Sequence, residues 1–161
     1  MTGNTDQTAE ELAHPDAQEL LRTEPLARLA YNGADGAPRV IPIGFWWTGD
    51  RVVVCTSDTA PKVRALAARP PVALTIDGAG ASQTLQLRGE AQIEIVDGIP
   101  EEYLASSFKG IPDEDQRRQF EASVRSTYAR MARISIEPRW ARFYDFGAGR
   151  LPGFMTKLIS G

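Results

Sequence analysis

The clearest pattern in the chain is a strict alternation of apolar and polar residues between residues 84 and 95. The apolar positions of this stretch are Leu85, Leu87, Gly89, Ala91, Ile93 and Ile95. Such a two-residue period predicts a β-strand that rests one face on a core and turns the other toward solvent or a partner. This strand is therefore the best-determined element of the sequence.

Shorter runs rich in β-branched and aromatic residues predict further strands. They cover residues 26–32, 38–48, 51–56, 72–76 and 132–146. Gly-rich turns at residues 32–36 and 48–50 are of the kind that joins antiparallel strands. Pro42 and Gly44 interrupt the run 38–48 and fit an edge strand, a bulge or a ligand contact better than a central strand.

Apolar residues at helical spacing predict four helices. The expected helices cover residues 8–21, interrupted at Pro15, then 59–68, 100–108 and 113–131. The last carries an apolar stripe of Phe120, Val124, Tyr128 and Met131. Residues 147–161 have loop composition, with Leu151, Phe154 and Met155 as expected anchors.

Many strands joined by short turns, with few helices, favour a mainly β (α+β) fold: a closed or nearly closed antiparallel barrel with flanking helices. The helices are too few and too unevenly spaced for a doubly wound parallel sheet. We expect a disordered N-terminal tail over residues 1–8 and a single domain over residues 9–161.

Composition and charge exclude several classes of function. The net charge of −3 and the pI of about 5.2 provide no overall positive field for nucleic acid. The chain has a single cysteine, Cys55, and a single histidine, His14. This composition argues strongly against a closed zinc site and against a histidine-based catalytic triad. The chain has no targeting segment at its start and no apolar run of membrane-spanning length, so we expect a cytoplasmic protein with no membrane partner.

The segment from Thr56 to Lys62 offers the most distinctive chemistry. It places Ser and Thr hydroxyls before a short helix that should be capped by Asp58 or Thr59, with Pro61 and Lys62 in the first turn. Lysine is mildly unfavourable at the positive end of a helix, and a bound anion would reverse the sign of that interaction. The alternative is that Lys62 extends into water and the hydroxyls only cap the helix.

Each of three neighbouring features has two possible interpretations. Arg39 is either a solvated charge at a strand end or a second cation beside Lys62. The Val-rich strand around Cys55 indicates that this cysteine is a small buried apolar residue rather than a nucleophile. Trp46 and Trp47 should face opposite sides of their strand, so that one enters the core and the other lies at an interface or over a ring.

Residues 24–96 resemble the FMN-binding split β-barrel proteins related to pyridoxamine 5′-phosphate oxidase, and more closely the flavin/deazaflavin oxidoreductases of actinobacteria. The resemblance rests on the order and spacing of several short motifs. These are Arg39-x-x-Pro42, the Gly49-Asp50 hairpin, Thr56-Ser57, Lys62-Val63-Arg64-x-Leu66 and Leu85-x-Leu87-Arg88-Gly89-x-Ala91.

This resemblance implies a split β-barrel homodimer with the cofactor in a groove at the subunit interface. The cofactor would be FMN or, alternatively, the deazaflavin coenzyme F420. By position, the implied cofactor-binding residues are Arg39, Val40, Ile41, Pro42, Cys55, Thr56, Ser57 and Lys62. Lys62 matches the lysine that contacts the phosphate.

The implied function is an oxidoreductase that transfers a hydride to or from a small organic substrate. No catalytic side chain is expected, because the cofactor ring carries the hydride. Pro61 stands where the true oxidases have an arginine, and their C-terminal Arg-x-His motif has no counterpart after Trp140. We therefore do not expect vitamin B6 oxidation. The alternative is a non-catalytic split barrel that binds or stores a flavin or another flat ligand such as haem.

Overall fold

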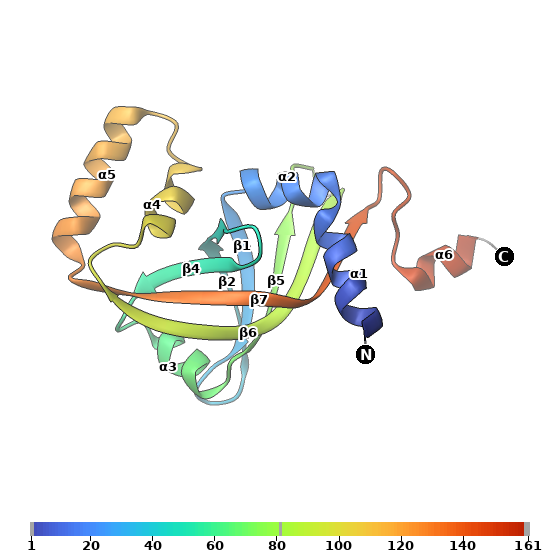
Figure 1. Cartoon of the computed structure of the whole chain (residues 1–161), viewed down its shortest axis with the longest axis horizontal. Helices are drawn as coiled ribbons and strands as arrows, with labels where there is room; N and C mark the ends of the chain where they lie inside the picture. The colour runs from blue at the N-terminus through green and yellow to red at the C-terminus, as the bar shows by residue number, and fades with distance from the viewer. Residues whose placement is uncertain (1, 81, 160–161) are drawn as a thin grey trace.

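One curved antiparallel sheet organises the protein. The structure, a computed structural model, describes residues 2–80 and 82–159. The strands of these residues are β1 Leu26–Asn32, β2 Pro38–Gly44, β3 Trp46–Trp47, β4 Val52–Ser57, β5 Pro71–Asp77, β6 Gln83–Asp97 and β7 Arg130–Asp145. The helices are α1 Thr2–Ala13, α2 Pro15–Thr23, α3 Pro61–Ala68, α4 Glu101–Phe108, α5 Glu114–Thr127 and α6 Gly153–Ile159. Figure 1 shows their arrangement.

The strand order explains why the sheet curls. Its seven strands follow the order β2-β1-β5-β6-β7-β4-β3, so β2 and β3 lie at opposite ends of the sheet. Yet only Phe45, which is fully buried, separates these two strands in the chain. The two ends of the sheet must therefore come close together without pairing. This confirms the expected mainly β (α+β) class and the split-barrel architecture, with the barrel left open between β2 and β3.

The long strands β6 and β7 form the spine of the sheet and run side by side below β4 in Figure 1. Their pairing shifts register between Arg88 and Gly89 of β6, where β7 carries one extra residue, Arg139. The predicted alternation is confirmed in the first part of β6, where Leu85, Leu87 and Ala91 are buried. Toward the end of β6 it fails, because Ile95 is 46% exposed.

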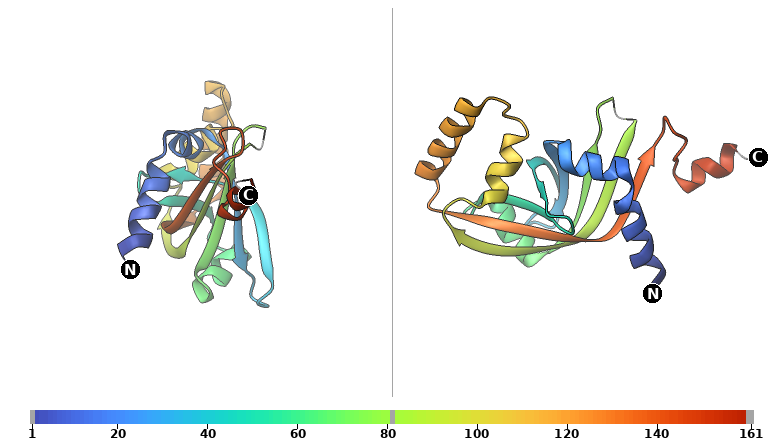
Figure 2. Two further views of the ribbon diagram at one scale, coloured as in Figure 1. Left: turned by 90° about the vertical axis from the view of Figure 1, so that its right-hand side faces the viewer. Right: turned by 45° about the horizontal axis from the view of Figure 1, so that its top comes forward.

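Two apolar clusters lie on this frame. The larger one fills the inside of the sheet and includes buried residues of α2, α3 and all strands except β2 and β3. The smaller one joins α4 and α5 to the start of β7 through Ile99, Leu104, Val124 and Met131. Figure 2 shows α4 and α5 as a lobe at one end of the long strands. All four members of the predicted stripe, Phe120, Val124, Tyr128 and Met131, belong to this smaller cluster or pack against it.

Residues 2–8 of the expected tail lie in α1, which begins at Thr2, and Thr8 is buried. Two contacts of Glu11 fix this helix on β7. Its Oε2 accepts hydrogen bonds from the backbone N–H of Phe143 at 2.8 Å and from Arg150 at 2.7 Å. The carboxylate of Glu11 thus joins α1 to β7 and to the segment after it, while Leu12 packs against the core.

His14 has a structural role at the junction of α1 and α2. Its Nδ1 accepts a hydrogen bond from the backbone N–H of Asp16 at 3.2 Å, which caps α2. The ring also packs on Phe143, with 4.7 Å between ring centroids.

The C-terminal segment differs from the expected loop. It contains the short helix α6, which projects from the sheet in Figure 1 and has no buried residue. Phe154, expected as an anchor, is 68% exposed. No helix in the described part of the chain is both long and apolar enough to cross a membrane.

Candidate functional site

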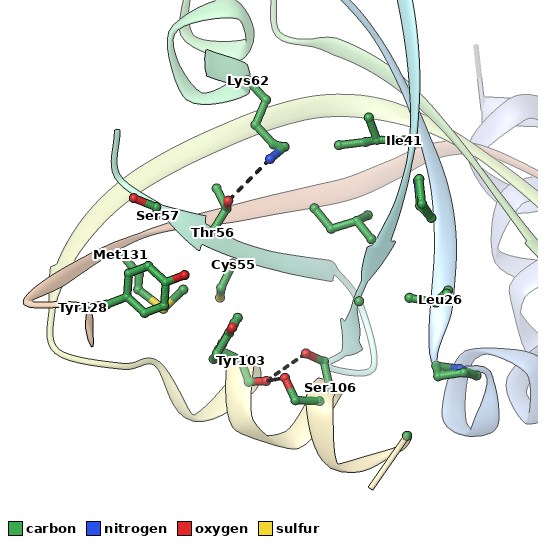
Figure 3. Close-up of a pocket in the computed structure, with 16 residues that line it drawn as sticks. Leu26, Ile41, Cys55, Thr56, Ser57, Lys62, Tyr103, Ser106, Tyr128 and Met131 are labelled. Atoms are coloured by element: carbon green, nitrogen blue, oxygen red, sulfur yellow. Dashed lines mark hydrogen bonds between the residues drawn. The ribbon is translucent and has the colours of Figure 1, made fainter. Parts of the chain in front are cut away.

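A pocket of about 680 Å³ opens between the β2 end of the sheet, β4, α3 and α4. Figure 3 shows this pocket. Its lining comes from Pro25, Leu26, Ile41, Pro42, Ile43, Gly44, Cys55, Thr56, Ser57, Lys62, Tyr103, Ser106, Ser107, Gly110, Tyr128 and Met131. The volume falls within the usual range for sites that hold a small molecule or a cofactor.

Lys62 supplies the charge at one end of the pocket. It lies in the first turn of α3, and its Nζ donates to the Thr56 hydroxyl at 3.5 Å, the contact drawn in Figure 3. Ser57, the last residue of β4, lines the same corner. This arrangement brings an ammonium group, two hydroxyls and a helix N-terminus together.

The cap of α3 differs from the prediction in a way that favours an anion. Ala60, not Asp58 or Thr59, is the N-cap residue, and it provides no side-chain hydrogen bond to the first turn. Pro61 does occupy the first turn, as expected. A helix that begins without a side-chain acceptor leaves its partial positive charge available to a ligand.

Nearby acids do not neutralise Lys62. Asp58, the closest carboxylate in sequence, forms an ion pair with Arg130 at 2.9 Å instead. No ion pair of Lys62 occurs among the described residues, and the pocket lining contains no carboxylate. Among the described residues, the ammonium group of Lys62 thus lines the cavity with a hydroxyl partner and no ion-pair partner.

The structure divides the residues expected on β2. Ile41 and Pro42 line the pocket, together with Ile43 and Gly44 of the same strand. Gly44 faces α4, because a Cβ at this position would lie 3.5 Å from the Ser106 hydroxyl oxygen. The backbone of β2 therefore forms a flat wall.

Arg39 and Val40 do not line the pocket. Arg39 lies near the β1–β2 turn, where it pairs with Asp35 at 2.8 Å and donates to the carbonyl oxygen of Ala37. Val40 is 66% exposed. Within one chain, the structure does not bring Arg39 beside Lys62, because β2 pairs with β1 and not with β4.

Cys55 lines the pocket as a neutral thiol. Burial, and secondarily the carboxylate of Glu102, raises the pKa of Cys55 to about 12. Because the thiolate is the nucleophilic form, Cys55 is unreactive at neutral pH. This agrees with its interpretation as a small buried residue.

The α4 side of the pocket was not anticipated from the sequence. Tyr103, Ser106, Ser107 and Gly110 come from α4 and the turn after it, and Tyr128 and Met131 come from the junction of α5 and β7. The signal that could have identified them is the presence of tyrosines in stripes that otherwise need only apolar residues. The hydroxyl of a tyrosine seeks a polar partner even when its ring is packed.

Lys109 lies outside the pocket lining and joins the end of α4 to the end of α2. Its Nζ donates to the carbonyl oxygens of Leu21 and Glu24, each at 3.1 Å, and lies 4.1 Å from the centroid of the Phe45 ring. Burial lowers the pKa of Lys109 to about 8. This lysine therefore ties the end of α4 to the end of α2.

Comparisons with solved structures agree with this fold. An F420 reductase is 23% identical, with 77% of this chain and 94% of that chain covered and a TM-score of 0.60. A conserved hypothetical protein of Mycobacterium tuberculosis is 18% identical over 87% of this chain and 89% of that one, with a TM-score of 0.66. An FAD and haem binding protein of Mycobacterium smegmatis is 21% identical over 92% of this chain and 78% of that one, with a TM-score of 0.57.

Sequence comparison identifies the family directly. A search of curated protein sequences gave no match. The family described as pyridoxamine 5′-phosphate oxidase, by contrast, matches residues 13–130, which is more than half of the chain and includes every lining residue of the pocket except Met131. The chain with this split barrel and this lysine-bearing pocket belongs to the pyridoxamine 5′-phosphate oxidase family.

Proposed function

We propose that this protein is an oxidoreductase that holds FMN or the deazaflavin F420 in the pocket beside α3 and transfers a hydride to or from a small organic substrate. The observation that carries this proposal is Lys62, a cation without an ion pair among the described residues, at the uncapped start of α3 and facing a cavity. The likeness to an F420 reductase and to an FAD and haem binding protein supports a cofactor of this class.

The Lys62 corner and the β2 wall of the pocket both fit such a cofactor. Lys62, Thr56 and Ser57 offer donors for a phosphate group, which a helix N-terminus also favours. The wall formed by Pro42 and Gly44 presents little side chain, so a flat ring can lie against the backbone of β2. A single lysine grips a phosphate less firmly than a lysine and arginine together, because it adds a point charge without a planar fork.

The residues of the chain then have roles in binding and orientation. The cofactor ring supplies the hydride chemistry when bound. Lys62 and Thr56 anchor the phosphate end, Ile41 and Ile43 exclude water from the ring, and the backbone of β2 fixes its plane. Cys55 remains a thiol and forms no covalent bond with a substrate.

We further propose that the working form is a homodimer with the cofactor at the subunit interface. β2 is a terminal strand of the sheet, and it presents Val40 to solvent next to the pocket wall. Leu26, which lines the pocket, is also 52% exposed. A second copy covering this edge would bury both side chains and close the open side of the pocket.

The second candidate is a non-catalytic flavin-binding protein. The absence of a carboxylate or imidazole from the described lining favours it, as does the likeness to the FAD and haem binding protein. Oxidation of the reduced cofactor by added substrates in single-turnover measurements distinguishes the two candidates. Transfer to no substrate would favour the binding protein.

Replacement of Lys62 tests the proposal. Lys62→Ala removes the cation at the phosphate end and should weaken FMN or F420 binding about tenfold to a hundredfold, because a hydrogen bond to a charged group contributes roughly 1.5–3 kcal/mol. Fluorescence titration with each cofactor measures the effect, and thermal unfolding should change little because the lysine is only half-buried.

Arg64→Ala is the matched control. Arg64 lies on the same helix, is exposed and does not line the pocket, so its replacement should leave cofactor affinity unchanged. Equal affinity of wild type and Lys62→Ala would show that the phosphate is held elsewhere. Failure of both cofactors to bind the wild-type protein would overturn the proposed function.

A further inference from the structure

The end of the pocket opposite Lys62 forms a chemically distinct space, which we call the α4 compartment. It is lined by Cys55, Tyr103, Ser106, Tyr128 and Met131. In Figure 3 the tyrosines, Cys55 and Met131 gather near α4 and the start of β7, whereas the Lys62 side chain reaches in from α3 on the other side. The compartment is thus the part of the pocket left to a substrate once a cofactor is anchored at Lys62.

The charges closest to this compartment neutralise one another. Glu102 of α4 pairs with Arg133 of β7 at 2.6 Å, and this guanidinium lowers the pKa of Glu102. Arg130 pairs with Asp58 at 2.9 Å. These two ion pairs compensate the guanidinium groups of Arg130 and Arg133 at the β7 side of the compartment.

Lys109, at the end of α4, is directed elsewhere. Its ammonium group donates to the carbonyl oxygens of Leu21 and Glu24 and lies against the ring of Phe45. Lys109 does not line the pocket, although Gly110, the next residue, does. Its charge is therefore used in holding α2 and α4 together.

Cys55 and Tyr103 of the compartment are uncharged at neutral pH. Burial raises the pKa of Cys55 to about 12. Burial also raises the pKa of Tyr103, with smaller contributions from Tyr128 and Cys55. A thiol and a protonated phenol thus line the space.

The polar groups that remain are hydrogen-bond donors. Neither the Tyr103 nor the Tyr128 hydroxyl has a hydrogen-bond partner among the described residues, whereas Ser106 and Ser107 both donate to the backbone oxygen of Tyr103, at 2.9 and 2.8 Å. The Tyr103 ring stacks on Phe120 with 6.1 Å between centroids, so its position is fixed. Two fixed or packed phenols suit a substrate oxygen that accepts hydrogen bonds.

We propose that the α4 compartment binds an uncharged, largely apolar substrate whose oxygen acceptor is held by the Tyr103 and Tyr128 hydroxyls. The inference rests on the proposed function, because Lys62 is assigned to the cofactor phosphate. A phosphorylated or carboxylated substrate would lose its hydration without meeting a counter-charge from this chain, and an ammonium group would meet no carboxylate. Charge, rather than size, is then the first determinant of specificity at this site.

A series of three aryl ketones tests the inference: acetophenone, 4-acetylbenzoate and 4-(trimethylammonio)acetophenone. They share the carbonyl acceptor and differ in charge. Cofactor affinity is measured first, and each ketone is then titrated into the cofactor-loaded protein while the absorption band of the cofactor is followed. We expect the neutral ketone to bind at least about tenfold more tightly than either ion.

Two variants assign the preference to the compartment. Replacing both tyrosines by phenylalanine (Tyr103→Phe with Tyr128→Phe) should weaken acetophenone binding about fivefold per lost hydrogen bond and leave cofactor affinity unchanged. Tyr144→Phe, on β7 and outside the pocket lining, is the matched control. Ser107→Lys adds a cation to the pocket wall and should admit 4-acetylbenzoate; circular dichroism checks that each variant is folded.

The outcomes separate this inference from the proposed function. If neither FMN nor F420 binds, both fail. If a cofactor binds and either ion binds as tightly as acetophenone, the function stands and the neutral substrate class is wrong. Rejection of the anion alone would overturn the inference too, because repulsion by the cofactor phosphate would then explain it.

Discussion

At the scale of single residues, local chemistry identified one end of the site and missed the other. Lys62, Thr56 and Ser57 were predicted because a lysine at a helix start is unfavourable without an anion, and they do line one corner of the pocket. Arg39 was placed beside them on the assumption that residues 38–56 form one hairpin. The chain instead breaks at Phe45, and Arg39 lies opposite Tyr31 on β1.

Lys109 makes a residue-scale prediction about pH. Burial lowers its pKa from 10.5 to about 8, so between these two pH values the unfolded chain holds more protons than the folded one. Stability from this group must therefore rise as pH increases from 8 to 10.5. In Lys109→Met this rise is absent. We expect the stability of wild type relative to the variant to increase by about 1–2 kcal/mol over this window, a value reduced for partial exposure.

Urea denaturation of both proteins at several pH values measures this difference. Cys55, whose pKa is raised to about 12, makes the opposite contribution, because the unfolded thiol loses its proton first. It is present in both proteins, so its contribution cancels. A difference that stays constant from pH 8 to 10.5 would contradict the assignment of the low pKa to Lys109.

At the scale of elements, regular patterns were predicted well and interruptions were not. The strands at residues 72–76 and 84–95 correspond to β5 and β6, because alternation and flanking turns define them. The run 38–48 divides into β2 and β3 because Phe45 turns into the core between the two ends of the sheet. The polar sequence before residue 8 gave no sign of α1, which depends on contacts with β7 far away in the chain.

The bulge where β7 pairs with β6 supplies a prediction at this scale. A Cβ on Gly89 would overlap the carbonyl oxygen of Glu137 on the neighbouring strand, so Gly89→Ala must displace backbone. We expect a loss of roughly 2–4 kcal/mol in the free energy of unfolding. Chemical denaturation checks this value. Gly153→Ala, at a position with open space around it, is the control and should cost little; a similarly small loss for Gly89→Ala would show that the bulge relaxes freely.

At the scale of the whole molecule, the sequence predicted the architecture through the order of its motifs. Antiparallel strands linked by short turns limit the possible folds, and the split barrel follows once β2 and β3 are consecutive in the chain but terminal in the sheet. The site was less predictable because the α4 side of the pocket is formed by α4 and the start of β7. Nothing in the local sequence of Tyr103 or Tyr128 says that these helices close over β4.

Proposed dimer formation is tested at the exposed edge of the sheet. Val40→Lys places a charge on β2, where it should disrupt an apolar interface and leave the monomer folded, because Val40 is largely exposed within one chain. Sedimentation velocity should show a shift from dimer to monomer, together with weaker cofactor binding. Ala67→Lys, on the exposed side of α3, adds the same charge away from this edge and should do neither. An unchanged dimer in Val40→Lys would place the interface elsewhere.

The position of β4 in the sheet also governs when the pocket can exist during synthesis. β4 has only the two-residue β3 beside it until residues 131–136 arrive and β7 pairs along its full length. Contacts so distant in the chain form late and slow folding. The Lys62 corner is therefore unsupported on a growing polypeptide, and the proposed cofactor can be captured only after residues 131–136 have left the ribosome.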